Sequence, residues 1–315
     1  MSTNYHANLT IRPRSPYDFD LSASIFSGGE PSFSRYESGR FSQALRLRDG
    51  LALSRVTSAG EVEKPVLKAR LSSNYPLEKK EKDEAGDKLS WILNLDLDLQ
   101  PFYNAVHEDP VLSDLTRDLR GLKSPRTPSV YEALVDSIIE QQISLGAAHA
   151  MQRRLVLKYG DQLEVGGLKI YAFPGPGRLA AATPEGLREC GLSWKKTEYV
   201  ITISRAIHEG ALDLESLSGL SGTDEMIGEL RKLRGVGTWT AELTLLRGLG
   251  RLDAFPADDL GIRRLISRTY SGGRAISGEE ARVIAERWGN WKGLSAFYLI
   301  MAEKLQITSS KSDLR

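Results

Sequence analysis

The sequence predicts an α+β protein, with an antiparallel sheet domain over residues 1–98 and an all-helical region over residues 99–315. Three observations predict this division. Before residue 98, apolar and polar residues alternate in short segments, with the period of two that is typical of half-buried strands. From about Pro101 the apolar spacing changes to three and four residues, as on one face of a helix. Capping residues and glycine turns then divide the second region into separate helices.

Short alternating segments in the first region predict strands at residues 8–12, 43–48 and 89–97. The Asp49-Gly50 pair between two such segments predicts a hairpin, because glycine accepts the backbone angles of a two-residue turn. Gly28-Gly29 and Ala59-Gly60 predict further turns. We expect the stretch KKEKDEAGDK at residues 79–88 to be a charged, mobile loop. No cluster in this region suggests chemistry, so we assign it a scaffolding role.

Charge and cysteine content restrict the function. With 42 basic and 41 acidic residues, the chain has no bulk positive charge, so any surface for nucleic acid must be local. No run approaches the roughly 20 apolar residues that span a bilayer, and the N-terminus lacks a signal-peptide core. We therefore expect no membrane partner and a cytoplasmic location, or a nuclear one in a nucleated cell. The single cysteine, Cys190, excludes an internal disulfide and a cysteine-ligated iron–sulfur or zinc site.

Residues 228–264 carry the strongest functional signal. Apolar residues at helical spacing predict a helix over 224–233. Gly235 and Gly237 then allow positive φ and a tight turn, and Thr238 is suited to cap the next helix. The amides near Gly235, Gly237 and Trp239 lack helical partners, so they can face an anion such as phosphate. For the two glycines alone, an ordinary helix-turn-helix corner is the better interpretation, because such turns are common.

Two adjacent acids follow this hairpin and change that interpretation. Asp258 and Asp259 come after a short extended segment and directly before another predicted helix. One acid at such a position is usually an N-cap. Because one cap is needed and two acids are present, a carboxylate remains for chemistry.

The stretches LRGVGTWTAELTLLRG and DAFPADDLGIRR match the helix-hairpin-helix (HhH-GPD) DNA glycosylases almost throughout. They resemble the alkylation-repair branch, the 3-methyladenine DNA glycosylase II type. The resemblance implies a hairpin at residues 224–250 within two helical subdomains, and SPYDFDLSASIF is similar to the sheet domain of that branch. The family's essential aspartate corresponds to Asp259, with Asp258 as the alternative. Strand-cleaving members carry a lysine where this chain has Trp239, which implies a monofunctional glycosylase.

The resemblance also implies the DNA contacts. The gap left by a flipped nucleotide would be filled by Gln142, with Ile143 as the apolar alternative, although glutamines between helices are more often simply solvated. Trp239 is the expected wall of the base pocket, and Leu243 and Ile300 replace pocket aromatics of some relatives, so base selectivity does not carry over. Expected phosphate contacts are Gly235, Gly237, Trp239, Arg263 and Arg264, with Lys195 and Lys196 as further candidates. The backbone carbonyls of Arg231, Leu233 and Val236 are expected ligands of a monovalent cation, Na⁺ or K⁺.

The expected reaction is hydrolysis of an N-glycosidic bond in double-stranded DNA that contains damaged bases. Positive charge develops on the sugar, so a fixed carboxylate stabilises the transition state. Alkylated purines such as 3-methyladenine are already cationic and leave without a strong general acid. We expect a monomer that requires no cofactor and has no iron–sulfur cluster. Two alternatives stay open: a non-catalytic helix-hairpin-helix DNA-binding protein, and a glycosylase/lyase that acts on oxidised bases.

Overall fold

The computed structural model describes residues 4–27 and 33–307. Its N-terminal part is a five-stranded antiparallel sheet in the order β1-β5-β4-β3-β2. The strands are β1 (Tyr5–Ile11), β2 (Ser34–Glu37), β3 (Arg40–Leu47), β4 (Gly50–Ser58) and β5 (Leu67–Ser73). The strands expected at residues 8–12 and 43–48 are confirmed as β1 and β3. The predicted hairpin joins β3 to β4, but its two turn residues are Arg48 and Asp49, because Gly50 already pairs with Leu47. The turn predicted at Gly28-Gly29 lies outside the described residues.

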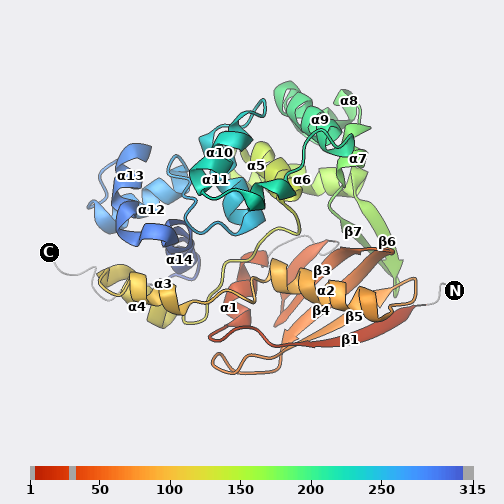
Figure 1. Cartoon of the computed structure of the whole chain (residues 1–315), viewed down its shortest axis with the longest axis horizontal. Helices are drawn as coiled ribbons and strands as arrows, with labels where there is room; N and C mark the ends of the chain where they lie inside the picture. The colour runs from red at the N-terminus through yellow and green to blue at the C-terminus, as the bar shows by residue number, and fades with distance from the viewer. Residues whose placement is uncertain (1–3, 28–32, 308–315) are drawn as a thin grey trace.

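One face of this sheet is buried under two helices, α1 (Phe19–Ala23) and α2 (Lys79–Ile92). Figure 1 shows α2 lying across the sheet. Alternate strand residues point toward it, so that Phe41 and Leu71 share a core with Ala85 and Leu89 of α2. Full burial of a leucine or phenylalanine side chain stabilises the fold by about 1.5–3 kcal/mol. The sheet and α2 therefore form one packed unit.

Helix α2 corrects two predictions. The stretch 79–88 is helical and not a mobile loop, because Glu81, Ala85 and Leu89 fall on one helical face that packs on the sheet. The strand expected at residues 89–97 is also wrong. Its first residues form the last turn of α2, and Leu93 and Leu95 are buried in the loop that follows. The alternation of leucines here reflects a buried loop and not strand pairing.

The remaining chain is mostly helical and forms two subdomains around separate cores. The first core involves α5 (Val130–Glu140), α6 (Leu145–Tyr159), α7 (Pro176–Ala180), α8 (Pro184–Glu189), α9 (Trp194–His208), α10 (Thr223–Arg231) and α11 (Thr238–Thr244). The second involves α3 (Gln100–Ala105), α4 (Pro110–Asp118), α12 (Leu260–Tyr270), α13 (Gly278–Ala285) and α14 (Lys292–Lys304). In Figure 1, most helices of these two groups lie side by side above the sheet, whereas α3 and α4 lie beside it. The predicted fold class, a sheet domain followed by helical subdomains, is confirmed.

A β-hairpin interrupts the region that we expected to be all-helical. It consists of β6 (Asp161–Val165) and β7 (Leu168–Ala172), joined by Gly166-Gly167 with φ of +59° and +75°. Its apolar side chains, such as Leu163 and Ile170, pack on Leu51 and Leu53 of β4. The hairpin thus covers part of the sheet face that α2 leaves open.

A buried lysine ties the sheet domain to the helices. Lys123 is fully buried, and its Nζ donates hydrogen bonds to the carbonyls of Arg14 at 2.8 Å and Leu95 at 2.7 Å. Burial lowers the pKa of Lys123 to about 8. Nearby, Asn94 donates to the carbonyl of Ser124 at 3.0 Å. These bonds fix the sheet domain against the start of the helical region.

A cleft of about 2270 Å³ opens where the sheet domain and the two helical subdomains meet. It is lined by residues of β3, α5, α6, α11, α12 and α14 and by the loop between α5 and α6. Within residues 4–27 and 33–307, no helix is long and apolar enough to cross a membrane.

Candidate active site

The predicted helix-hairpin-helix borders this cleft, with α10 ending at Arg231 and α11 beginning at Thr238. Gly235 has a φ of +90°, and a Cβ there would lie 2.2 Å from the ring of Tyr199, so only glycine fits. Gly237 is different. Its φ is −91°, it is exposed, and a Cβ there would have nothing within 4 Å. The positive φ that we expected at Gly237 is therefore wrong.

The start of α11 also differs from the prediction. Gly237 is the N-cap, and no side chain caps the helix, so Thr238 does not have the role we expected. A side-chain cap would occupy the amides of the first helical turn. Without one, these amides stay available beside an exposed glycine that lines the cleft.

Asp259 begins α12 and combines two roles. Its Oδ1 accepts the amide N–H of Ile262 at 3.0 Å, and its Oδ2 accepts the indole N–H of Trp239 at 3.3 Å. We expected the two acids to divide cap and chemistry between them. Instead, Asp259 provides the cap itself and still presents its second oxygen to the cleft, because the cap uses only one oxygen. The cap fixes the orientation of the carboxylate.

Asp258 lies beside this site but in a different environment. Its side chain is exposed, and its Oδ1 lies against the start of α13, where it would be 2.2 Å from a Cβ on Gly278. It also lines the cleft. No cap or indole contact fixes Asp258, so Asp259 is the better oriented of the two acids.

The cleft wall near Asp259 is largely apolar. It includes half-buried Trp239 and buried Leu243 from α11, together with Phe297 and Ile300 from α14. Planar rings and branched aliphatic side chains of this kind provide stacking and contact surface for a nucleobase. The wall thus combines an apolar surface with one oriented carboxylate.

The loop between α5 and α6 places Gln142 at the cleft. Gln142 is exposed and has a φ of +56°, a left-handed conformation that is uncommon for residues other than glycine. Ile143 is half-buried and packs on the core of the first helical subdomain. Of the two residues predicted as a plug, Gln142 is thus the more accessible. Backbone strain of this kind is often kept at functional positions.

Two neighbouring side chains hold this loop in place. The Gln141 amide Nε2 donates to the carbonyl of Gly235 at 2.8 Å and to Thr240 Oγ1 at 3.0 Å, so it connects the loop to the hairpin. Lys196 Nζ donates to the carbonyls of Ile139 and Gln141, both at 2.7 Å. Lys196 therefore caps the end of α5 and is not the free phosphate contact that we predicted. The role of Gln141 was missed, because it depends on contacts distant in sequence.

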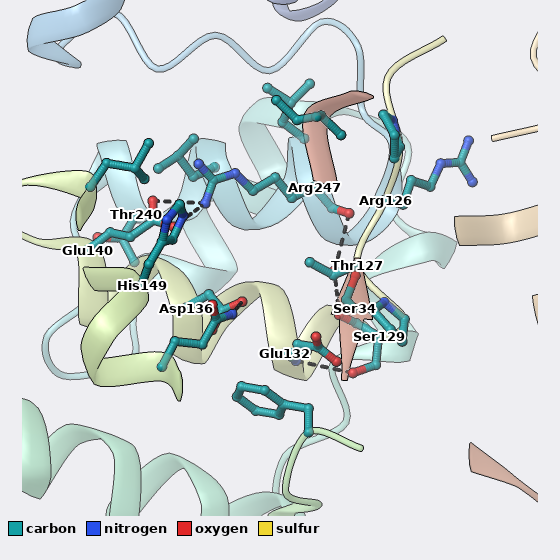
Figure 2. Close-up of a pocket in the computed structure, with 18 of the residues that line it drawn as sticks. Ser34, Arg126, Thr127, Ser129, Glu132, Asp136, Glu140, His149, Thr240 and Arg247 are labelled. Carbon is teal, nitrogen blue, oxygen red and sulfur yellow. Dashed lines mark hydrogen bonds and ion pairs between the residues drawn. The ribbon is translucent and has the colours of Figure 1, made fainter. Parts of the chain in front are cut away.

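A row of carboxyl groups on α5 was also missed. Glu132, Asp136 and Glu140 lie one helical turn apart and line the cleft (Figure 2). Arg247 Nη1 donates to both oxygens of Glu140, at 2.7 and 2.8 Å, and Gln152 donates to Asp136 at 2.7 Å. The i, i+4, i+8 spacing of the acids was visible in the sequence. The burial of Asp136 was not, because it depends on how the neighbouring elements pack.

Asp136 gives a prediction for the pH dependence of stability. Burial, together with the nearby Glu140 carboxylate, raises the pKa of Asp136 to about 8. An unfolded aspartate has a pKa of about 4, so between these two values the folded state holds a proton that the unfolded state has released. The free energy of unfolding should therefore fall as pH rises through this window. Asp136→Asn removes this titration. The melting temperature of the variant should therefore rise relative to that of the wild type between pH 5 and pH 8. A constant difference across this range, measured by thermal denaturation, would contradict the prediction.

The basic residues between 231 and 268 divide into engaged and available groups. Several form ion pairs: Arg234 with Glu198, Lys232 with Glu229, Arg251 with Asp253, and Arg268 with Glu303. Arg264 is exposed and lines the cleft. Arg263 is half-buried, and its Nε has no hydrogen-bond partner among the described residues. Arg264 is thus the better placed of the two predicted arginine contacts.

The comparisons with known proteins agree with this geometry. Residues 135–290 match the family model described as HhH-GPD superfamily base excision DNA repair protein. The DNA-3-methyladenine glycosylase of Bacillus subtilis is 34% identical over 229 residues, which is 73% of this chain and 75% of that protein. The chain therefore belongs to the HhH-GPD superfamily of base excision DNA repair proteins. Within that superfamily it falls in the branch of the 3-methyladenine DNA glycosylases.

One solved structure supports the same placement, and a second supports the fold. The 3-methyladenine DNA glycosylase from Archaeoglobus fulgidus superposes with a TM-score of 0.83 at 31% identity, covering 95% of this chain and 99% of that one. The Clostridium acetobutylicum 8-oxoguanine glycosylase/lyase, solved with double-stranded DNA, gives a TM-score of 0.74 at 21% identity, covering 98% and 100%. This second likeness shows a shared fold only.

Proposed function

We propose that this protein is a monofunctional DNA glycosylase. It removes cationic, alkylated purines such as 3-methyladenine from double-stranded DNA and leaves an abasic site. The observation that carries the proposal is the orientation of the Asp259 carboxylate. Its Oδ1 caps α12, and its Oδ2 lies in the cleft beside Trp239. The relatives named as 3-methyladenine glycosylases support the same substrate class.

Asp259 is the proposed catalytic residue. As the N-glycosidic bond breaks, positive charge develops on the deoxyribose, and a carboxylate held beside it stabilises the transition state more than the ground state. The same oxygen can orient a water molecule for attack on the anomeric carbon. An alkylated purine leaves as a neutral base, so no strong general acid is required. This agrees with the lack of histidine in residues 224–264.

The hairpin is the proposed phosphate contact. The uncapped amides at the start of α11 and the exposed Gly237 allow a DNA phosphate to approach the backbone. We also propose that a monovalent cation binds the carbonyls of Arg231, Leu233 and Val236. Within the described chain, the carbonyls of Arg231 and Val236 accept no backbone hydrogen bond, and that of Leu233 accepts one from the Val236 amide. These oxygens fit a hard cation, which would bridge the hairpin to a phosphate.

Strand cleavage separates this proposal from the lyase alternative. A lyase needs an amine that forms a Schiff base with the sugar. Trp239 occupies the hairpin position where strand-cleaving members carry that lysine, although Lys88 and Lys304 line other parts of the cleft. The test uses duplexes that each carry one alkylated or oxidised base. We expect strand breaks only after alkali and only with alkylated bases. Breaks without alkali, or a borohydride-trapped covalent adduct, would favour the lyase.

The proposed plug gives a separate prediction. If Gln142 fills the space of the flipped nucleotide, Gln142→Ala should slow excision from a fully paired duplex about tenfold. The loss should be smaller where the lesion is mispaired or unopposed, because less unstacking energy must be compensated. Single-turnover rates on matched substrates measure this ratio. A Gln142/Ile143 double variant shows whether the two losses add or overlap. Equal losses on all substrates would mean that the loop acts only through the fold.

A further inference from the structure

The sheet face opposite α2 carries a cluster of cations outside the cleft. In register, one row across the five strands is Asn8, Arg70, Arg55, Ser42 and Arg35, and the next is Thr10, Lys68, Thr57, Arg40 and Glu37. Paired residues point to the same face, so these ten side chains share one surface. We call it the basic sheet face. It holds five cations and one carboxylate.

Most of these cations have no acidic partner. Glu37 pairs with Arg35 at 2.6 Å, and Lys68 donates to Thr10 at 2.8 Å. Among the described residues, Arg40, Arg55 and Arg70 form no ion pair. Arg55 and Arg70 are direct cross-strand neighbours, and like charges placed in this way destabilise a sheet. The pKa of Arg55 is lowered by burial and by the charges of Arg40 and Arg70.

The basic sheet face is hollowed and open. A depression of about 650 Å³ is lined by Arg40, Arg55, Lys68 and Arg70 together with the polar side chains of Asn8, Thr10 and Thr57. It shares no lining residue with the large cleft. The next part of the same face is apolar, and there Leu53 packs under the β6–β7 hairpin. The hairpin thus stops short of the cations and leaves them accessible.

We propose that the basic sheet face binds the sugar–phosphate backbone of a DNA segment other than the one in the cleft. Guanidinium groups suit phosphate oxygens, which they can contact through two parallel hydrogen bonds. From β5 to β2 the cations span three strand spacings, or about 14 Å, which matches roughly four nucleotides along one strand. A groove of DNA admits a helix or a two-stranded ribbon, and this five-stranded sheet is too broad to enter one, so the face contacts the backbone and recognises charge and not sequence.

A pair of matched variants tests this surface. Arg55→Gln with Arg70→Gln removes two cations from the face, and Lys79→Gln with Lys80→Gln removes two exposed cations from α2 in the same domain. The readout is affinity for undamaged duplex DNA at several salt concentrations. Two lost phosphate contacts should lower the salt dependence, the slope of log K against log salt, by about 1.8. The α2 variant should keep the wild-type slope, and single-turnover base release at saturating enzyme should be unchanged in both.

Further outcomes make the test decisive. Because repulsion between Arg55 and Arg70 is relieved, their double variant should melt at or above the wild-type temperature, so weaker binding would not reflect unfolding. Arg40→Gln with Lys68→Gln should independently lower the slope. Equal slopes for wild type and both face variants would overturn the proposal. If both face variants lost binding of polyglutamate but kept wild-type binding of DNA, the face would be assigned to acidic peptides and the proposal would likewise be overturned.

Discussion

Replacing Asp259 with asparagine should lower the single-turnover rate of base release at least about 100-fold, the scale seen when a preorganised electrostatic contact is lost. The affinity for duplex DNA should stay near the wild-type value, because the carboxylate acts on charge that develops only in the transition state. The fold should also survive. Asparagine caps a helix as well as aspartate does, so the bond from the Ile262 amide to the side-chain oxygen is retained.

Asp258→Asn is the matched control for this variant. Asp258 is adjacent in sequence and lines the same cleft, but neither a cap nor an indole contact orients it. Its loss should reduce the rate by no more than a few-fold. If Asp258→Asn were the more damaging change at unaltered melting temperature, the assignment of the two acids would have to be reversed.

The two hairpin glycines should respond to alanine in opposite ways. At Gly235, positive φ and the ring of Tyr199 both oppose a Cβ, so Gly235→Ala should cost at least about 2 kcal/mol of folding free energy. At Gly237 the backbone accepts alanine and a Cβ meets nothing, so the fold should be unaffected. The added methyl group should instead hold a phosphate away from the amides. Affinity for every duplex should then fall about tenfold, the scale of one charge-assisted hydrogen bond.

Thermal denaturation and duplex binding, measured on both glycine variants, separate these effects. If Gly237→Ala bound duplex DNA with wild-type affinity at all salt concentrations, the hairpin would not be part of the DNA interface. A wild-type melting temperature in Gly235→Ala would show that Tyr199 moves aside easily.

The sheet could be predicted from sequence where local chemistry decides the structure. The β3–β4 hairpin is one case, since the flanking alternation and the Asp49-Gly50 pair place the chain reversal within one residue of the observed Arg48-Asp49 turn. Helix α2 is the opposite case. Its sequence is mostly charged, with few apolar residues on one helical face, among them Ala85 and Leu89. That face is buried only because the sheet packs against it, and the local sequence does not indicate this packing. The β6–β7 hairpin was missed although Gly166-Gly167 between alternating segments is a turn signal.

The same distinction applies to the site. Asp259 could be identified from its place in a motif, and its cap on Ile262 is local, but the contact of its Oδ2 could not be predicted, since it depends on where Trp239 lies. Gln141 and Lys196 reach the backbone of other segments, and nothing in their local sequence indicates those contacts. Long-range packing likewise decides that Asp136 is buried, which raises its pKa to about 8. The sequence thus indicates which residues carry the chemistry, whereas the fold determines how they are held.

The most direct test of the proposed function is chromatographic identification of the bases that the purified protein releases from methylated double-stranded DNA. Wild-type protein should release free methylated purines, 3-methyladenine among them, and leave strands that break only after alkali. The Asp259→Asn variant should bind the same DNA and release almost none. Wild-type protein that binds this DNA but releases no base would contradict the proposal and would favour a non-catalytic DNA-binding protein.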